Sequence, residues 1–238
     1  MISTDSPGKM AKCGWFSNSF AAAACDSAWT TLMSSLRSYG DPCGIARALD
    51  AVGERWALLV VRELLLGPKR FTDLKDGLCG ASPNVLSQRL RELEAAGVVQ
   101  RRKDGPALYE LTDWGRELHP ILVQLGRWGA RSRVRPSGEL GADALMIALE
   151  STFRPEKAGE LRASYEVRLG EKRYVVDVEA GTISVTRGTA RKADAVIATD
   201  PATLRAVALG DRKLAGAPVE IHGDARLGRR FFDLFARP

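Results

Sequence analysis

The 238-residue chain has few of the residues that metal sites and disulfide frameworks require. Only four cysteines and two histidines occur, and the widely spaced cysteines form no Cys-x-x-Cys pair. These counts favour neither a zinc site nor a disulfide-stapled fold, and they indicate a reduced, cytoplasmic compartment. No apolar run approaches the roughly 20 residues that cross a bilayer, so we expect no membrane partner. We predict no metal and no other cofactor.

Over most of the chain, basic residues barely outnumber acidic ones. The formal net charge is +6, and residues 41–137 hold most of it, with 16 basic against 12 acidic residues. Residues 1–40 have 3 basic and 2 acidic residues, and residues 138–238 have 16 and 15. A local excess of this kind is expected if the middle of the chain meets phosphate.

Changes of pattern divide the chain. Residues 1–38 are rich in Ser and Ala without sustained periodicity, and we expect a poorly ordered extension there. Residues 39–131 are mostly helical in pattern, and residues 139–238 alternate with period two before returning to helix. Between them, residues 132–138 combine Arg, Pro and Gly, which is typical of a linker. The predicted fold class is α+β, in two domains.

The first domain has the element order of a winged helix-turn-helix. Ser82-Pro83 gives an N-cap followed by proline at the first helical position, and Gly97 is a good stop. Asp104-Gly105 is a hairpin turn between two short strands. Such a fold places the second helix of the pair in the major groove. The predicted elements are helices over 45–52, 55–66, 71–78 and 83–97, a hairpin over 98–112 and a helix over 114–130.

The helix over 83–97 has two different faces. Leu86, Leu90 and Leu93 share one side, which we expect to face the core. The opposite side carries amides that can pair with adenine and an arginine that can pair with guanine. The Ser82 cap leaves backbone N–H groups free for a phosphate, and the basic residues of the wing can reach the DNA backbone. The predicted DNA-binding residues are Ser82, Asn84, Ser87, Gln88, Arg91, Arg102 and Lys103.

A polar solvent face, or a winged helix that binds protein, would show part of the same pattern. The segments 43–56, 62–74 and 82–94 (CGIARALDAVGERW, RELLLGPKRFTDL and SPNVLSQRLRELE) closely resemble the HxlR family of bacterial regulators. This resemblance spans about residues 39–130. It implies a homodimer, formed by the first and last helices, that binds an inverted-repeat operator. The wing is short for the family.

Cys43 is a candidate redox residue. Members of the HxlR family often carry a cysteine at this position, at the start of the first helix, and some use it to sense oxidants. A thiol near a helix N-terminus gains thiolate character, which gives oxidation a mechanism. The alternative is a small interface residue without a signalling role.

The second domain resembles sterol carrier proteins over about residues 139–236. The resemblance rests on segments 193–204 and 219–226 and on Phe231-Phe232, and it implies an apolar ligand between a sheet and its helices. A solid core would need the same apolar residues. No acid–base pair, nucleophile constellation or phosphate loop is evident, so we do not expect an enzyme. The candidate ligand-binding residues are Phe153, Leu204, Leu214, Phe231, Phe232 and Phe235.

Together these features predict a homodimeric HxlR-type repressor that binds double-stranded DNA. A small apolar effector or thiol oxidation would modulate it. The alternative is a lipid or small-molecule carrier whose winged helix is mainly a dimerisation module.

Overall fold

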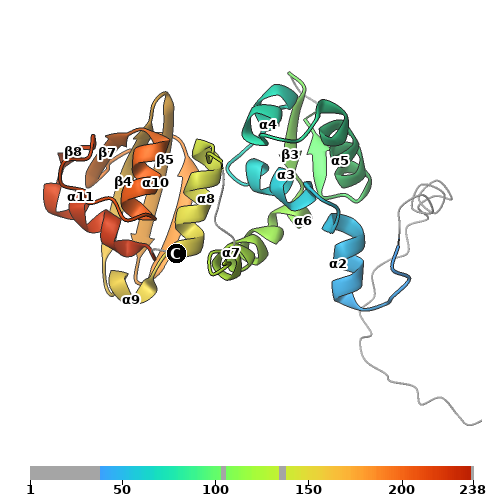
Figure 1. Cartoon of the computed structure of the whole chain (residues 1–238), viewed down its shortest axis with the longest axis horizontal. Helices are drawn as coiled ribbons and strands as arrows, with labels where there is room; N and C mark the ends of the chain where they lie inside the picture. The colour runs from blue at the N-terminus through green and yellow to red at the C-terminus, as the bar shows by residue number, and fades with distance from the viewer. Residues whose placement is uncertain (1–37, 103–105, 134–137, 237–238) are drawn as a thin grey trace, which may run out of the picture. The chain divides into compact units, whose positions relative to one another are not determined.

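Two sheets, each with its own helices, organise the chain (Figure 1). The structure is a computed structural model, and it describes residues 38–102, 106–133 and 138–236. All but the last residue of the predicted N-terminal extension lies outside these ranges, as do Lys103, the predicted turn at 104–105 and residues 134–137 of the predicted linker. Within the described ranges, no helix is long and apolar enough to cross a membrane.

The first half is a winged helix-turn-helix, as predicted. Its three-stranded sheet has the order β1-β3-β2. The short strand β1 was not predicted from the sequence, and it adds to the edge of the wing hairpin. The elements are α2 (Gly44–Val52), α3 (Ala57–Leu64), β1 (Lys69–Arg70), α4 (Phe71–Gly77), α5 (Pro83–Ala95), β2 (Val99–Arg101), β3 (Leu108–Leu111), α6 (Asp113–Arg116) and α7 (Leu118–Gly129).

Local chemistry sets the ends of these helices. The Ser82 hydroxyl accepts a hydrogen bond from the Val85 N–H at 3.3 Å, and Pro83 occupies the first turn of α5. At the other end Gly97 has φ +74°, a conformation that favours glycine and ends the helix. Helix α3 begins two residues later than predicted, because Trp56 is left-handed with φ 79°. The predicted last helix divides into α6 and α7, and the Thr112 hydroxyl caps α6.

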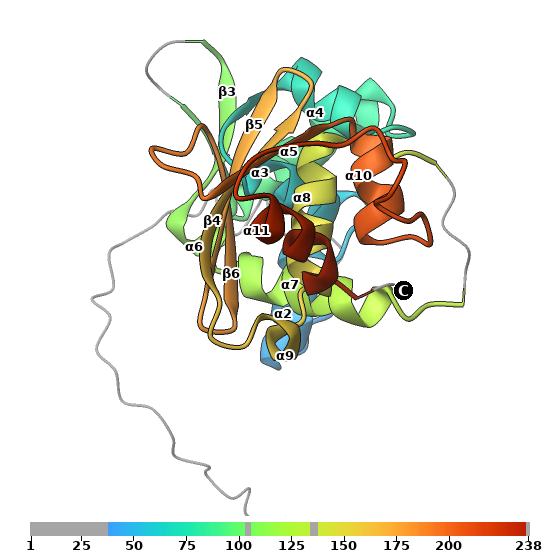
Figure 2. The same ribbon diagram turned by 90° about the vertical axis from the view of Figure 1, so that its left-hand side faces the viewer.

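The second half is an α+β layer, with helices on one face of a five-stranded sheet (Figure 2). The sheet order is β6-β5-β4-β7-β8, in which β4 and β7 run parallel and the other neighbours antiparallel. The alternating pattern predicts strands over 161–169, 174–179, 182–187, 195–199 and 219–222, and all five form within two residues of these ends. The elements are α8 (Ala142–Thr152), α9 (Pro155–Ala158), β4 (Arg162–Leu169), β5 (Lys172–Glu179), β6 (Thr182–Arg187), β7 (Ala195–Thr199), α10 (Pro201–Ala208), β8 (Glu220–Gly223), α11 (Ala225–Phe231) and η1 (Phe232–Leu234).

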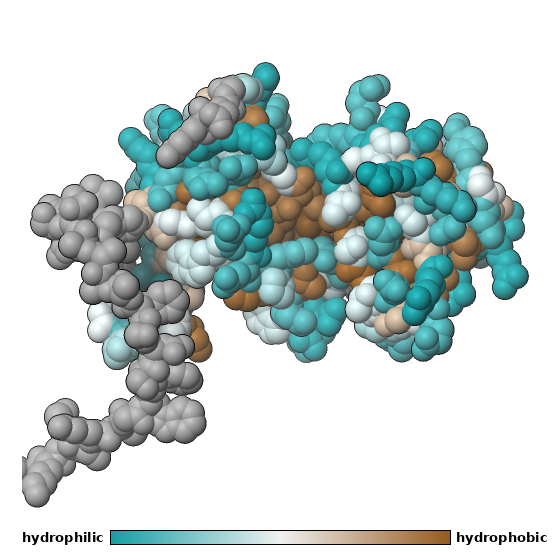
Figure 3. All heavy atoms as spheres, turned by 180° about the vertical axis from the view of Figure 1, so that it is seen from behind, coloured by the Kyte–Doolittle hydropathy of each residue, from teal (hydrophilic) through white to brown (hydrophobic). Residues whose placement is uncertain are grey.

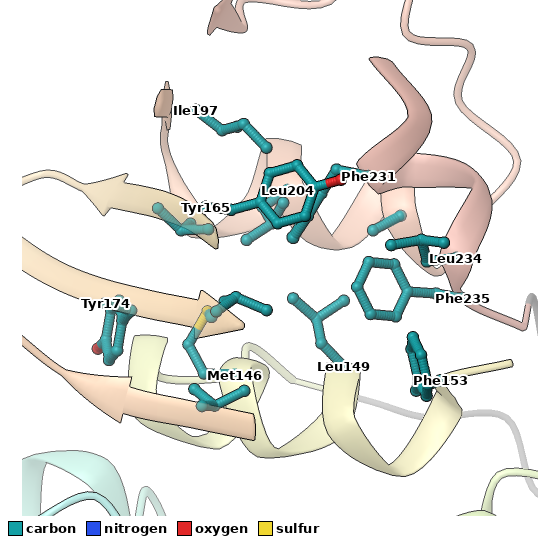
Figure 4. Packing of buried hydrophobic residues seen from close by; sticks show 14 of the residues in the cluster. Met146, Leu149, Phe153, Tyr165, Tyr174, Ile197, Leu204, Phe231, Leu234 and Phe235 are labelled. Atoms are coloured by element: carbon teal, nitrogen blue, oxygen red, sulfur yellow. The ribbon is translucent and has the colours of Figure 1, made fainter. Parts of the chain in front are cut away.

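A tightly packed core lies between this sheet and its helices (Figure 4). The Phe231 ring makes edge contacts with the rings of Tyr165, Phe232 and Phe235, with centroids 5.0–5.4 Å apart. Aromatic rings prefer this geometry, and each buried ring removes much apolar surface from water. Leu66, two residues after the end of α3 in the winged-helix half, joins the same core.

Helices α7 and α8 pack directly against each other. The His119 Nε2 lies 2.9 Å from the Glu150 Oε2, and the Arg127 Nε donates to the Ser151 carbonyl at 3.4 Å. A Cβ atom on Gly126 would lie 2.6 Å from the Ser151 hydroxyl oxygen, so only glycine permits this close approach. The C-terminal layer is therefore joined to the last helix of the winged-helix half.

Candidate nucleic-acid interface

Helix α5 separates its leucines from its polar residues as the periodicity predicts. Leu86, Leu90 and Leu93 are at most 1% exposed and pack in the core of the winged-helix half. The residues predicted to meet DNA lie on the other side: Ser82, Asn84, Gln88 and Arg91 are exposed, and Ser87 is half-buried. The fold thus brings the predicted helix residues together on one accessible surface.

Two of these side chains differ in their freedom. The Gln88 Nε2 donates to the Glu92 Oε1 at 3.0 Å, one helical turn further along. No hydrogen bond or ion pair to the Arg91 guanidinium occurs within the described residues. Arg91 can therefore reach a ligand directly, whereas Gln88 must first exchange its Glu92 contact.

Arg89, on the flank of the same helix, serves the fold. It is 8% exposed, and its guanidinium pairs with Glu92 and lies 3.6 Å from Glu54, two residues after the end of α2. These contacts connect α5 to the first helix, as expected of a structural arginine.

Carboxylates accompany the basic residues of the wing. The Arg101 Nε lies 3.0 Å from the Glu94 Oε1, and the Arg101 guanidinium stacks over the Tyr109 ring at 5.1 Å. Arg102 is exposed and lies 3.8 Å from Glu110, which also accepts from Gln100. The carboxylate partners of Gln88, Arg101 and Arg102 were not predicted from the sequence. Of these contacts, only the Gln88–Glu92 pair on α5 has a signal in the sequence, its i, i+4 spacing.

Cys43 occupies the N-cap of α2 and is exposed, and its thiol makes no cap hydrogen bond. Its backbone N–H donates to the Asp41 carboxylate at 2.8 Å. Cys79 is the other free cysteine of the described residues, and it too is exposed.

The six candidate ligand-binding residues fall into two settings. Phe153, Leu204, Phe231, Phe232 and Phe235 are at most 6% exposed and belong to the filled core of the C-terminal layer. Leu214 is partly buried at its edge and, with Phe232, lines a pocket of about 770 Å³ between α10, β8 and α11. Outside the lining of this pocket, the Tyr165 hydroxyl is buried in the core without a hydrogen-bond partner among the described residues, and burial raises the pKa of Tyr165 to about 12.

Apolar side chains also remain exposed on the first and last helices of the winged-helix half. Ile121, Leu125 and Trp128 follow i, i+4, i+7 spacing along α7 and are 43–68% exposed. Ile45 and Leu49 form a shorter stripe on α2. In the space-filling view, brown apolar atoms interrupt the teal surface over both halves (Figure 3).

The fold and the accessible polar face of α5 define the chain as a helix-turn-helix transcriptional regulator that binds DNA. The model of HxlR-like helix-turn-helix proteins matches residues 51–136. The HTH-type transcriptional regulator YvaP of Bacillus subtilis is 42% identical over 86 residues, which are 34% of this chain and 80% of YvaP. The HTH-type transcriptional regulator sll1512 of Synechocystis is 37% identical over 95 residues, 38% of this chain and 70% of its own length. The chain therefore belongs to the HxlR-like helix-turn-helix family.

Among solved structures, the quinone-bound YodB from B. subtilis is 30% identical. The match covers 37% of this chain and 97% of YodB, with a TM-score of 0.34.

Proposed function

We propose that the chain is a repressor that binds an inverted-repeat operator as a homodimer, with α5 in the major groove. The observation that carries this proposal is the accessible face of α5, where Asn84, Gln88 and Arg91 lie opposite the buried leucines. Amides can pair bidentately with adenine, and arginine with guanine. Ser82 at the helix start, and Arg102 and Lys103 on the wing, would contact phosphates.

The exposed stripes on α2 and α7 would be covered by a second copy of the chain. Together they hold five large apolar side chains that face water in the single chain. Contiguous exposed apolar surface is typical of an interaction site. In a twofold dimer the same patch serves both partners, and two recognition helices one DNA turn apart require an inverted repeat.

We further propose that the C-terminal layer is a sterol carrier protein-like domain that binds a small apolar effector. The pocket beside Leu214 and Phe232, which Arg229 and Asp233 also line, supports a ligand with apolar bulk and a polar group. Oxidation of the exposed Cys43 would be a second way to regulate DNA binding, because this residue lies two positions before Ile45 on the proposed dimer surface.

The promoter region of the chain's own gene serves as the operator fragment in all of the following experiments. A gel shift with the full chain and this operator fragment tests the DNA-binding proposal. We expect a shifted band that unlabelled operator fragment competes away and that an equal mass of unrelated DNA does not. The pocket also favours a second candidate, a carrier whose winged helix serves dimerisation. That candidate predicts loading with apolar compounds and no preference for the operator fragment.

A further inference from the structure

A buried group of charges connects the C-terminal layer to the small sheet of the winged-helix half. The Lys69 Nζ lies 2.5 Å from the Glu63 Oε2 and 2.7 Å from the Asp143 Oδ2. Glu63 belongs to α3, Lys69 to β1 and Asp143 to the first turn of α8. All three side chains are at most 5% exposed. Nothing in the sequence pattern predicts this cluster, because a lysine after Gly-Pro and an acidic residue in the first turn of a helix usually lie on the surface.

Each carboxylate also has donors of its own. Asp143 accepts from the Tyr174 hydroxyl at 2.7 Å and from the Arg187 guanidinium at 2.5 Å, and the Lys172 Nζ lies 3.6 Å away. Glu63 accepts from the Arg62 guanidinium at 2.9 Å. Burial alone would raise the pKa of Asp143, but the bonds from Arg187, Lys69 and Tyr174 outweigh it and hold that pKa well below its usual range. The Lys69 ammonium is thus shared by two carboxylates from different halves.

The position of Lys69 gives this contact a consequence for the DNA-binding surface. Lys69 pairs with Tyr109 and Arg70 with Leu108, so β1 holds the second strand of the wing. Helix α4 begins at the next residue, Phe71, and leads into α5. A displacement of α8 therefore acts through Lys69 on the base of the wing and on the start of the helix-turn-helix.

We propose that Asp143 and Lys69 are positioning residues through which the C-terminal layer holds the wing and α4 in the geometry that binds DNA. This inference rests on the proposed operator binding. A buried charge left without a partner is costly. Here the contact between the halves can open at lower cost, because Arg62 stays with Glu63, and Arg187 and Tyr174 stay with Asp143. An effector in the C-terminal layer would change operator affinity if it bound the protein with this contact open and with it closed with different affinity.

Asp143→Asn in the full chain tests the proposal, since the amide keeps the size and the Tyr174 contact but loses the charge that attracts Lys69. We expect faster amide hydrogen exchange at Lys69–Phe71 and Tyr109, with β4 and β5 unchanged. The dissociation constant for the operator fragment rises about fivefold or more, the lower range of couplings between sites. Tyr174→Phe is the matched control: it removes a donor to the same carboxylate from within the C-terminal layer, and both readouts stay as in the wild type.

Lys69→Met supplies the same comparison from the other side of the contact and serves if Asp143→Asn does not fold. In the double variant, operator affinity falls no further than in the weaker-binding single variant, because the Lys69–Asp143 pair, the contact between the halves, is already lost in each single variant. Additive losses, or wild-type exchange at β1 and wild-type affinity in Asp143→Asn, overturn the proposal. If the wild-type chain shows no preference for the operator fragment, operator binding itself fails, and exchange at β1 and β3 still decides whether the ion pair positions them.

Discussion

Individual side chains of α5 make the proposed base contacts. Arg91 is accessible and unengaged within the described part of the chain, whereas Gln88 is held by Glu92. The two therefore differ in what they give up on binding. Arg91 loses only water, and Gln88 exchanges one hydrogen bond for another.

We expect Arg91→Ala and Gln88→Ala each to weaken operator binding by roughly 1–3 kcal/mol and to relax the preference at one base position. Gel shifts with a set of single-base operator variants would measure both effects. Arg162→Ala, an exposed arginine of the C-terminal sheet, is the charge-matched control and should bind as the wild type. Equal losses on operator and random DNA would remove these two residues from base recognition.

At the scale of elements, the wing combines basic residues with nearby carboxylates. Glu94 and Glu110 lie within 4 Å of Arg101 and Arg102, so part of the positive charge is balanced before DNA arrives. Both arginines are more than half exposed, and screening by water keeps such pairs weak and exchangeable.

Arg102→Ala and Lys103→Ala should weaken binding to every DNA sequence and flatten its salt dependence. With each phosphate contact that is lost, fewer counterions are released from the DNA on binding. Titrations of operator and random DNA at several salt concentrations measure the slope. A slope and an affinity that match the wild type in both variants would mean that the short wing does not reach DNA.

Sequence pattern predicted the elements whose signal is local. The leucine spacing of α5, its Ser82-Pro83 start and the Gly97 stop are short-range features, and the structure confirms them. The start of α3 was wrong by two residues, because nothing in the sequence marks Trp56 as left-handed. Strand β1 was missed because two residues make no periodicity, and the Lys69–Asp143 pair because its members are 74 positions apart and meet only through tertiary packing.

At the scale of the whole molecule, the contact between α7 and α8 contains a titratable group. The hydrogen bond to Glu150 raises the pKa of His119 above its ordinary value of 6.5, against the opposing effect of burial. A raised folded-state pKa means that the contribution to stability is fully present below pH 6.5 and is lost as pH rises through the folded value.

His119→Gln should therefore lower the melting temperature of the full chain more at about pH 6 than at about pH 8. His222→Gln, on exposed strand β8, is the matched control and should leave the pH dependence as it is. Thermal melts across this range supply the comparison. An equal effect of His119→Gln at both pH values would show that protonation of His119 does not strengthen its contact with Glu150.

Truncation tests whether the winged-helix half binds DNA and the C-terminal layer binds the ligand. A fragment that ends near Ser137 contains α2, α5 and α7, so we expect it to dimerise and to bind the operator, but about fivefold or more weakly than the full chain, because it lacks Asp143. An apolar ligand at 100 times its dissociation constant stabilises the folded state by ~2.7 kcal/mol. Such a ligand should raise the melting temperature of the full chain and not that of the fragment. Stabilisation without a change in operator affinity would leave a carrier domain and remove the effector role.

The central claim is that this chain reads DNA sequence through α5. Its most direct test is a titration of the full-length wild-type chain against the operator fragment and against a scrambled fragment of equal length, at one physiological salt concentration. We predict that the operator binds about 10³-fold or more tightly, as specific regulators do. Equal affinity for the two fragments would contradict the claim.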